Sequence, residues 1–293
     1  MKPSSRWTPF ILLAPAITIF VFVVLVPMIG TIELSFTRWT GTNTMRFIGF
    51  DNYTRAFQDS VYRLTYKNTI IYILATLVLE VAVGFALAGL VSAKGKRTAW
   101  YRITFFIPVM LPMVVIAVLW SFVYAYDAGL LNSALEAVGL ESLTRVWLGD
   151  PNTALLAICF VSGWIYAGFY MAIFYAALRR IPSSILEAAA LDGANERQIF
   201  FRVKVPMVRN MTEVAILLCI TGGFQTFDLF YVMTNGGPDH ATEILTTYIV
   251  SVVFRDHDVG YGAAMSVIMT IVVLAIGVAY AKLRRKDVTG VEY

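Results

Sequence analysis

Long apolar stretches without any charge alternate along this chain with short polar segments rich in Lys and Arg. Four of the uncharged stretches exceed the roughly 20 residues with which an α-helix crosses the hydrocarbon core of a bilayer. Together they indicate an integral membrane protein. They predict membrane-crossing helices at about 9–33, 103–125, 153–178 and 259–282.

Two further stretches are apolar but not free of charge. The segment 68–93 holds Glu80 as its only charge, and the segment 211–233 holds Glu213 and Asp228 near its ends. Both are long enough to cross a bilayer, so we predict six crossings in all. The predicted fold class is an all-α integral membrane protein in which residues 1–293 form a single transmembrane domain.

Proline and glycine mark the places where helices should bend or end. Pro108 and Pro112 interrupt the third predicted span and predict a kink there. The segment 235–238 (NGGP) predicts a turn, and the apolar segment 243–254 after it is too short to cross. Two more helices are expected outside the membrane, one along the interface at 51–66 and one in an external loop near 133–138.

The basic residues predict the orientation of the chain. Most of the 23 Lys and Arg fall at the N-terminus and in the segments 94–102, 179–209 and 282–286. Because the cytoplasmic flanks of membrane spans are enriched in Lys and Arg, both termini and the polar segment 181–206 are expected in the cytoplasm. The net charge of +4 follows from this distribution and implies no nucleic-acid partner.

The segment 181–206 is too polar to stay in lipid and has the signals of two helices. Pro182 breaks the preceding span, Ser184 is a suitable N-cap, and Glu187 stands three residues later, as a capping box requires. Gly193 tolerates left-handed backbone geometry and lets one short helix turn into another. We therefore predict a helical hairpin on the membrane surface, with one helix on each side of Gly193.

The sequence contains no recognisable catalytic constellation. His240 and His257 are the only histidines, and no metal-ligand pattern surrounds them. The basic turn 93–97 lacks the leading glycine and the Ser or Thr of a phosphate-binding loop. The chain is therefore not expected to be an enzyme or to hold a metal or cofactor. If nucleotide energy is used, another chain must hydrolyse the nucleotide.

Glu80, an acid in the middle of a predicted span, has two interpretations. Burying its charge is costly, so an intramembrane carboxylate is first considered as part of a proton relay. A relay uses several ionisable groups, however, and the four uncharged spans contain none. We favour a neutral or hydrogen-bonded contact between helices over the relay.

A polar face within the membrane is predicted on two spans. The segment 221–226 (TGGFQT) gives the fifth span a polar, glycine-broken centre of the kind that lines transporter sites. One face of the fourth span carries a hydroxyl and aromatic rings, from Ser162, Tyr166, Phe169 and Tyr170. Trp120 and Tyr124 of the third span could extend this face into an aromatic wall. These aromatic residues also suit lipid-facing or packing roles. Because 103–126 and 151–178 lack Lys and Arg, a neutral polar ligand fits better than an anion.

Short motifs connect the polar hairpin with a known family. The segment 187–189 (EAA), Gly193 and the segment 203–206 (VKVP) follow the spacing of the EAA signature of permease subunits of binding-protein-dependent ABC importers, with valine at two positions where that family usually has Ile and Leu. Further motifs of this kind lie at 47–53, 227–238 and 260–264. Over nearly its whole length the chain resembles the carbohydrate-uptake branch, and in particular the larger maltose permease subunit without its extra N-terminal helices.

This resemblance implies a type I ABC importer permease fold of six transmembrane helices with a cytoplasmic coupling-helix hairpin. It implies a second, related permease that completes a heterodimer, two ATPase subunits that bind ATP and Mg, and an extracytoplasmic solute-binding protein. This chain would be the non-hydrolysing pore subunit in the inner membrane of a bacterial or archaeal cell, surrounded by membrane lipid.

The resemblance also implies roles for individual residues. The coupling helix would contact one ATPase through Glu187, Ala188, Ala189, Asp192 and Gly193. The substrate pathway would run midway through the helices that precede the hairpin and the Gly-Gly-Pro turn, in agreement with the polar face chosen above. Its residues would be Trp120, Ser162, Tyr166, Phe169, Gly223, Gln225, Thr226 and Asp228.

The expected function is ATP-driven import of a sugar or oligosaccharide by alternating access. A glycerol phosphate or a polyol is an alternative cargo. The alternative from another class is an ion-coupled secondary transporter that acts alone. Such a transporter would need buried coupling residues and a broken helix in each half of the chain.

Overall fold

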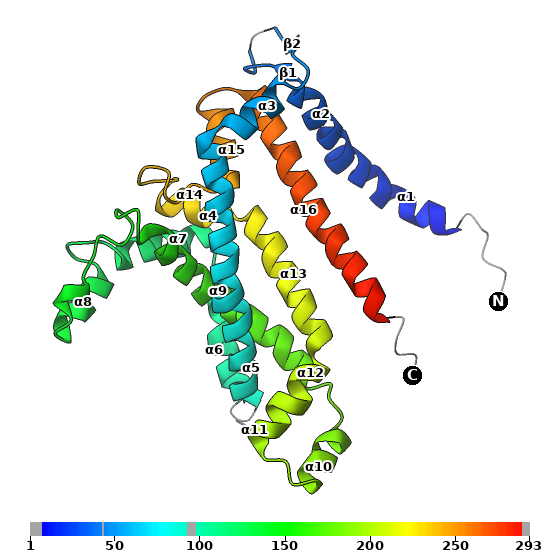
Figure 1. Ribbon diagram of the computed structural model, residues 1–293, viewed down its shortest axis with the longest axis vertical. Coiled ribbons are helices and arrows are strands. Elements are labelled where there is room, and N and C mark those ends of the chain that lie inside the picture. Colours follow the sequence, from blue (N-terminus) through cyan, green and yellow to red (C-terminus); the bar gives the residue numbers. More distant parts are fainter. Residues whose placement is uncertain (1–7, 43, 93–97, 289–293) are drawn as a thin grey trace. The chain divides into compact units, whose positions relative to one another are not determined.

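The computed structural model describes residues 8–42, 44–92 and 98–288 (Figure 1). Most of the described chain is helical. Two short antiparallel strands, β1 (Thr37–Arg38) and β2 (Arg46–Phe47), form a small hairpin. The segment 93–97, considered above as a phosphate-binding loop, lies outside the described residues.

Two compact units make up the chain. Unit 1 comprises Met1–Tyr62 and Ile249–Ala275, and unit 2 comprises Arg63–Tyr248 and Ile276–Tyr293. The chain therefore passes between the units three times, each time within a helix.

Unit 1 begins with a nearly continuous apolar helix. Its parts are α1 (Thr8–Phe20), the π-helical turn η1 (Val21–Leu25) and α2 (Val26–Ser35). The candidate span Leu12–Ser35 has 24 residues, and its apolar window is 0% buried. A helix with such an apolar surface must be surrounded by lipid or by another protein. The helix matches the first predicted span in place and length.

Polar contacts join α3 (Asp51–Gln58) to the first turn of α16 (Val259–Val288) in unit 1. Arg55 Nη1 lies 2.6 Å from Asp258 Oδ2, and the guanidinium carbon of Arg55 lies 3.9 Å from the ring centre of Tyr261. The hydroxyl of Tyr261 donates to Asp59 Oδ2 at 2.7 Å. These contacts fix the start of α16, whose apolar span Val259–Lys282 matches the last predicted crossing.

The interfacial helix predicted over 51–66 is wrong in its extent. α3 ends at Gln58, and α4 (Ser60–Thr76) begins after a single residue. Asp59 Oδ1 accepts hydrogen bonds from the backbone N–H groups of Val61 at 2.9 Å and Tyr62 at 3.0 Å, which is how a side chain caps a new helix. The second long helix therefore begins at Ser60 and not at residue 68.

The long helix α9 (Ala154–Leu178) is the centre of unit 2, and 61% of its apolar window is buried. It packs closely because glycines let backbones approach. A Cβ on Gly84 would lie 2.7 Å from the Cβ of Tyr170, and a Cβ on Gly168 would overlap the carbonyl group of Phe105. The elements packed against α9 include η2 (Leu77–Ala82), α5 (Val83–Ser92) and α6 (Thr98–Met110). Together, α4, η2 and α5 form one helix of 33 residues.

The third predicted span is sharply bent. The axes of α6 and α7 (Met113–Val123) differ by 96°. Pro112 stands at the break with a ψ of 130°, whereas Pro108 stays inside α6. Pro112 therefore accounts for the kink, as proline does where a helix breaks, and the segment 103–125 is not one straight crossing.

The fifth predicted span, 211–233, is not a continuous helix. α13 (Arg209–Gln225) has 17 residues, and α14 (Asp228–Met233) follows after a break. The glycines at 222 and 223 remain helical, so the prediction that they break the span is wrong. The break falls at Thr226, whose ψ is 138° and whose carbonyl accepts a hydrogen bond from Thr246 Oγ1. A contact with a distant residue thus sets the end of α13.

The number of crossings supported by length and composition is smaller than the six predicted. Four helices of the described chain qualify, and a fifth qualifies if the bent pair α6 and α7 counts as one span. The predicted span 211–233 is absent from this count because α13 ends at Gln225.

The predicted hairpin is present, but its first cap differs. α10 (Ser183–Leu191) starts after Pro182, so Ser184 is already helical and makes no cap. The Ser184–Glu187 capping box is therefore wrong. A capping box forms instead at the second helix, where the backbone N–H of Gln198 donates to Asn195 Oδ1 at 2.9 Å and that of Asn195 donates to Gln198 Oε1 at 2.8 Å. That helix runs through α11 (Glu196–Gln198), η5 (Ile199–Lys204) and α12 (Val205–Met207).

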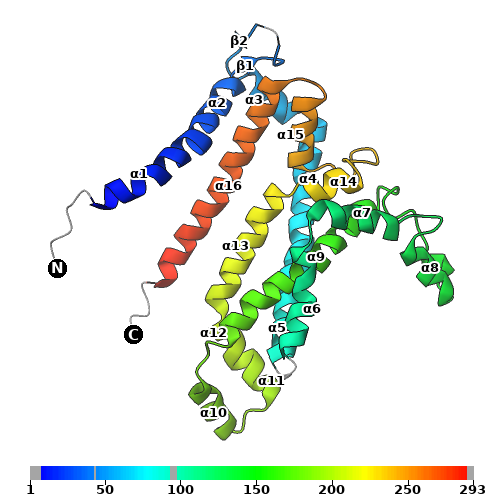
Figure 2. The ribbon, with the colours of Figure 1, turned by 180° about the vertical axis from the view of Figure 1, so that it is seen from behind.

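Three further predicted elements are present as local structure. The short helix expected near 133–138 is α8 (Leu130–Ala137), and the apolar segment 243–254 contains α15 (Leu245–Phe254). The Asn-Gly-Gly-Pro segment forms a turn in which Asn235 and Gly236 have φ values of 50° and 85°. Figure 2, seen from behind, shows α10 projecting beyond the ends of α5 and α13 in unit 2.

Candidate functional site

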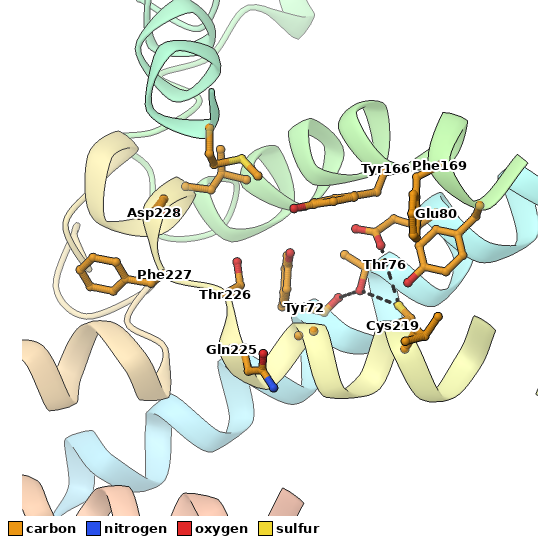
Figure 3. Close-up of a pocket in the computed structure, with 16 residues that line it drawn as sticks. Tyr72, Thr76, Glu80, Tyr166, Phe169, Cys219, Gln225, Thr226, Phe227 and Asp228 are labelled. Atoms are coloured by element: carbon orange, nitrogen blue, oxygen red, sulfur yellow. Dashed lines mark hydrogen bonds between the residues drawn. The ribbon is translucent and has the colours of Figure 1, made fainter. Parts of the chain in front are cut away.

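A cavity of about 380 Å³ lies in unit 2 between α4, η2, α9, α13 and α14 (Figure 3). Its walls grade from exposed to buried. Gln225 and Asp228 are exposed at one end, whereas Thr76, Glu80 and Cys219 are at most 5% exposed at the other. The cavity thus connects exposed polar residues with buried polar groups.

Hydrogen bonds converge on Glu80 at the buried end. Ser162 Oγ donates to Glu80 Oε1 at 2.7 Å, and the hydroxyl of Tyr72 lies 2.8 Å from Ser162 Oγ. Since a serine hydroxyl has one proton, and Ser162 gives it to Glu80, Tyr72 is the donor to Ser162. Cys219 Sγ lies 3.9 Å from Glu80 Oε2. The hydrogen-bonded helix contact predicted for Glu80 is confirmed.

Six of the eight residues expected in the substrate pathway line this cavity. They come from two elements that the sequence had suggested, α9 and the α13–α14 region. Figure 3 shows Tyr166 across the cavity from Tyr72 and Thr226. The six residues are Tyr166, Phe169, Gly223, Gln225, Thr226 and Asp228.

The other two expected residues do not line it. Ser162 is fully buried behind the wall, where it holds Glu80 and Tyr72. Trp120 lies in a different, apolar cavity of about 690 Å³, with its ring centre 5.8 Å from that of Phe160. The bend at Pro112 turns α7 so that Trp120 meets Phe160 and Trp164 of α9. Trp164 is two residues from Tyr166 and therefore lies on another face of the helix. The predicted wall joining Trp120 and Tyr124 to the cavity is therefore wrong.

Sequence reasoning missed one wall of the cavity. Tyr72, Thr76 and Glu80 line it from the long helix that contains α4 and η2. Their spacing of four residues places them on one helical face, and this pattern of polar residues within an apolar span could have identified the face. Met113, Cys219 and Phe227 were also missed, and no pattern in the sequence distinguishes them.

The hairpin presents an uncovered surface within unit 2. None of the residues of α10 to α12 is buried, and Leu191 is 89% exposed. Glu187, Ala188, Asp192 and Gly193 are exposed, and Ala189 is half-buried. Gly193 has a φ of 82°, which glycine adopts without strain.

The base of the hairpin is packed against the helix that carries Glu80. The ring of Phe200 in η5 lies with its centre 5.6 Å from that of Phe85, and a Cβ on Gly89 would lie 2.8 Å from the same Phe200 ring. Phe85 in turn contacts Phe174 of α9 at 5.0 Å between ring centres. The hairpin is therefore joined to the membrane part of unit 2 by aromatic packing.

Comparison with known proteins identifies the family. Residues 80–286 match the model of the family described as "Binding-protein-dependent transport system inner membrane component". The chain belongs to this family. The resemblance seen in the EAA-like motif is thereby confirmed.

Full-length relatives agree with this assignment. The probable ABC transporter permease protein YurN of Bacillus subtilis is 36% identical, over 96% of this chain and 97% of the relative. The diacetylchitobiose uptake system permease protein NgcF of Streptomyces coelicolor is 32% identical, over 88% of this chain and 76% of the relative.

A solved structure shows the same fold at lower sequence identity. A chain of a bacterial ABC transporter involved in the import of the acidic polysaccharide alginate superposes with a TM-score of 0.85 and 21% identity, over 96% of each chain. As a permease of this family, the protein is a multi-pass component of the inner membrane and a non-hydrolysing part of an ABC transporter. Membership thus favours the ABC permease over a secondary transporter that acts alone.

Proposed function

We propose that this permease is the pore subunit of an ATP-driven importer that moves a sugar or oligosaccharide from a solute-binding protein into the cytoplasm by alternating access. The observation that carries the proposal is the cavity in unit 2, where aromatic rings face hydroxyl and amide groups. Sugars have apolar faces that pack on rings and hydroxyl groups that need hydrogen-bond partners, so this mixture suits them. The uptake of diacetylchitobiose by the NgcF system supports the same class of cargo.

The proposed partners follow from what the permease must obtain from other chains. A second permease would complete a heterodimeric pore, and two ATPase subunits with ATP and Mg would supply the energy. A solute-binding protein would deliver the cargo from outside the cytoplasm. A solved relative with a TM-score of 0.83 is an alginate transporter in complex with its pentasaccharide-bound periplasmic protein, which supports this last partner.

The proposed topology has six crossings, with both termini and the segment 181–206 in the cytoplasm of a bacterial or archaeal cell. The bent pair of α6 and α7 would form the third crossing, and α13 with α14 the fifth. The excess of Lys and Arg on the flanks assigned to the cytoplasm supports this orientation.

The hairpin is proposed as the coupling helix that docks in a cleft of one ATPase. Moving a two-state pore from 1:99 to 99:1 takes differential binding of about 5.5 kcal/mol. One exposed ion pair from Glu187 contributes only about 0–1 kcal/mol. Burying an apolar side chain such as Leu191 contributes about 1.5–3 kcal/mol, so the apolar residues of α10 must supply most of the binding. Glu187 would orient the hairpin, Ala188 and Ala189 would allow close approach, and Gly193 would make the bend next to Asp192.

Cysteine labelling will test the orientation. The natural Cys159 and Cys219 are both buried, so an introduced cysteine gives the main signal. We expect Leu191→Cys to react with a membrane-impermeant maleimide only after the cell membrane is opened. Val138→Cys, at a position 69% exposed in the external loop, should react in intact cells. Labelling of Leu191→Cys in intact cells would contradict the proposed topology.

Reconstitution will test the function. Proteoliposomes should contain this permease, its partner permease and both ATPase subunits, with the binding protein outside. We expect accumulation of at least one labelled neutral trisaccharide, among maltotriose, cellotriose and raffinose. This accumulation should require ATP inside the vesicles, on the side of the ATPase subunits. Uptake driven by an ion gradient without the ATPase subunits would contradict the proposal. If glycerol 3-phosphate or sorbitol is taken up and none of the trisaccharides is, the cargo is a glycerol phosphate or a polyol and not an oligosaccharide.

A further inference from the structure

A groove of about 480 Å³ runs along one face of α6 in unit 2, and Ala172 of α9 also lines it. The α6 residues that line it recur at intervals of three or four from the first turn of the helix to the last, so they share one face. They are Ala99, Arg102, Ile103, Phe106, Ile107 and Met110. Arg102 is the one charged group among the described lining residues, and the rest of the lining is apolar.

The guanidinium of Arg102 has no acidic partner. Its central carbon lies 4.8 Å from the ring centre of Tyr175, so a cation–π contact holds it beside α9. Among the residues that the structure describes, no carboxylate forms an ion pair with it. The segments 81–126 and 151–186, which contain α6 and α9, have no Asp or Glu. Because a ring occupies only one face of a guanidinium, the N–H donors at its edge stay available for an anion.

The surroundings of Arg102 are typical of a membrane–water interface. Trp100 is 75% exposed and Tyr101 is 37% exposed, and such side chains are enriched at the level of the lipid headgroups. Arg102 and Met110 are eight residues apart, which is about 12 Å along a helix axis. One leaflet contributes about 15 Å of hydrocarbon, half of the bilayer core. The groove thus matches one leaflet in depth and has its positive charge at headgroup level.

An anionic phospholipid has the two parts that this groove can bind. A guanidinium binds phosphate oxygens through parallel N–H bonds, and basic pockets at the cytoplasmic side of transmembrane helices bind anionic headgroups. An acyl chain on the same molecule would cover the apolar side chains of Ile103, Phe106 and Ile107. A zwitterionic lipid carries a cation close to its phosphate, which weakens the attraction to Arg102. A free phosphate ion would leave the apolar part of the groove uncovered.

We propose that this groove is a binding site for an anionic phospholipid of the cytoplasmic leaflet, with the phosphate on Arg102 and an acyl chain along the apolar face of α6. The proposal goes beyond the proposed function, because it concerns a lipid bound to the permease and not the cargo. The attraction of one Arg to an anionic headgroup region corresponds to about a fivefold preference over a neutral one.

Lipid retention by the full-length permease tests this proposal. The protein is purified in detergent with the subunits that stay bound to it, delipidated, and mixed with equal amounts of dioleoyl phosphatidylglycerol and dioleoyl phosphatidylcholine. Native mass spectrometry then counts the bound lipids. We expect about fivefold more phosphatidylglycerol than phosphatidylcholine as the first bound lipid. Arg102→Gln should lower this ratio at least threefold, whereas Arg102→Lys, which keeps the charge, should retain more than half of it.

Two further variants separate the groove from a general attraction of anions. Arg180→Gln removes a positive charge just after the end of α9, at an exposed residue that does not line the groove, and should leave the ratio unchanged. Ala172→Phe keeps Arg102 but fills the groove, and should lower the retention of phosphatidylglycerol at least threefold. Thermal unfolding should verify that each variant is folded. If Ala172→Phe is not folded, the comparison of Arg102→Gln with Arg180→Gln still decides.

Three results would overturn the proposal. Equal retention of both lipids by the wild-type protein would mean that the groove does not select an anionic lipid, as expected if a helix of another subunit covers it. Equal effects of Arg102→Gln and Arg180→Gln would mean a general attraction of anions. Displacement of the lipid by soluble glycerophosphoglycerol would mean a site for free phosphate groups. None of these measurements involves transport, so the proposal and the proposed function can fail independently.

Discussion

Gly193→Pro is expected to lower ATP-driven uptake at least tenfold while the permease still assembles in the membrane and ATP hydrolysis continues. Gly193 has a φ of 82°, whereas proline holds φ near −65°. Its N–H donates to the carbonyl of Ala190 at 3.0 Å, and proline lacks this donor. The chain would therefore leave α10 in another direction. Because α10 would no longer fit the ATPase cleft in the proposed way, hydrolysis would lose its link to the pore.

Gly139→Pro is a closely matched control for this prediction. Gly139 has a φ of 76°, its N–H donates to the carbonyl of Glu136 at 3.0 Å, and no atom lies within 4 Å of a Cβ placed on it. Gly193 shares all three properties. Gly139 lies in the predicted external loop, so its variant should keep at least half of the uptake. Equal loss of uptake in both variants, or full uptake by Gly193→Pro, would remove the coupling role from the hairpin.

Gly168→Ala is expected to destabilise the permease by about 3 kcal/mol, at the upper end of the range for overpacked cores. The added methyl group would overlap the carbonyl of Phe105, which is backbone and cannot rotate away. α6 would have to separate from α9, the most buried long helix of the protein. Thermal unfolding of the solubilised permease, followed by size-exclusion chromatography with fluorescence detection, measures the loss.

The same substitution at an open position provides the comparison. Gly222 is helical in α13, and no atom lies within 4 Å of a Cβ placed there. Alanine favours a helix over glycine by about 1 kcal/mol, so Gly222→Ala should keep or slightly raise the unfolding temperature. If Gly168→Ala unfolds at the same temperature as Gly222→Ala, the close packing of α6 on α9 is not what holds this part of the protein together.

The sequence correctly predicted those helix ends and bends that are determined by residues close in the sequence. The fourth span, expected over 153–178, is α9 at Ala154–Leu178, because a long run without charges leaves few alternatives. The turn at Gly193 and the kink near Pro112 were also predicted, since each depends on what one residue's backbone allows. Such features need no knowledge of distant contacts.

Features set by distant contacts could not be predicted in this way. α13 ends at Gln225 because Thr246 bonds to the carbonyl of Thr226, not because of its glycines. Trp120 lies away from the cavity because a bend of 96° reorients α7, and proline predicts a bend but not its angle. The role of Glu80 in the cavity wall depends on which way the helix from Ser60 to Ser92 faces α9. The spacing of Glu80 with Tyr72 and Thr76 can be read from the sequence. The sequence does not say which helix lies opposite this face, so the spacing alone did not identify a cavity wall.

Phe200 packs the hairpin against the same helix that forms one wall of the cavity. Its ring rests over Gly89, and Glu80 stands nine residues earlier on the same continuous helix, about 13 Å along the axis. No loop lies between the two points to absorb a displacement. In the proposed mechanism, an ATPase that displaces the hairpin acts directly on the helix that lines the proposed cargo site, so force would reach the cargo without a separate relay.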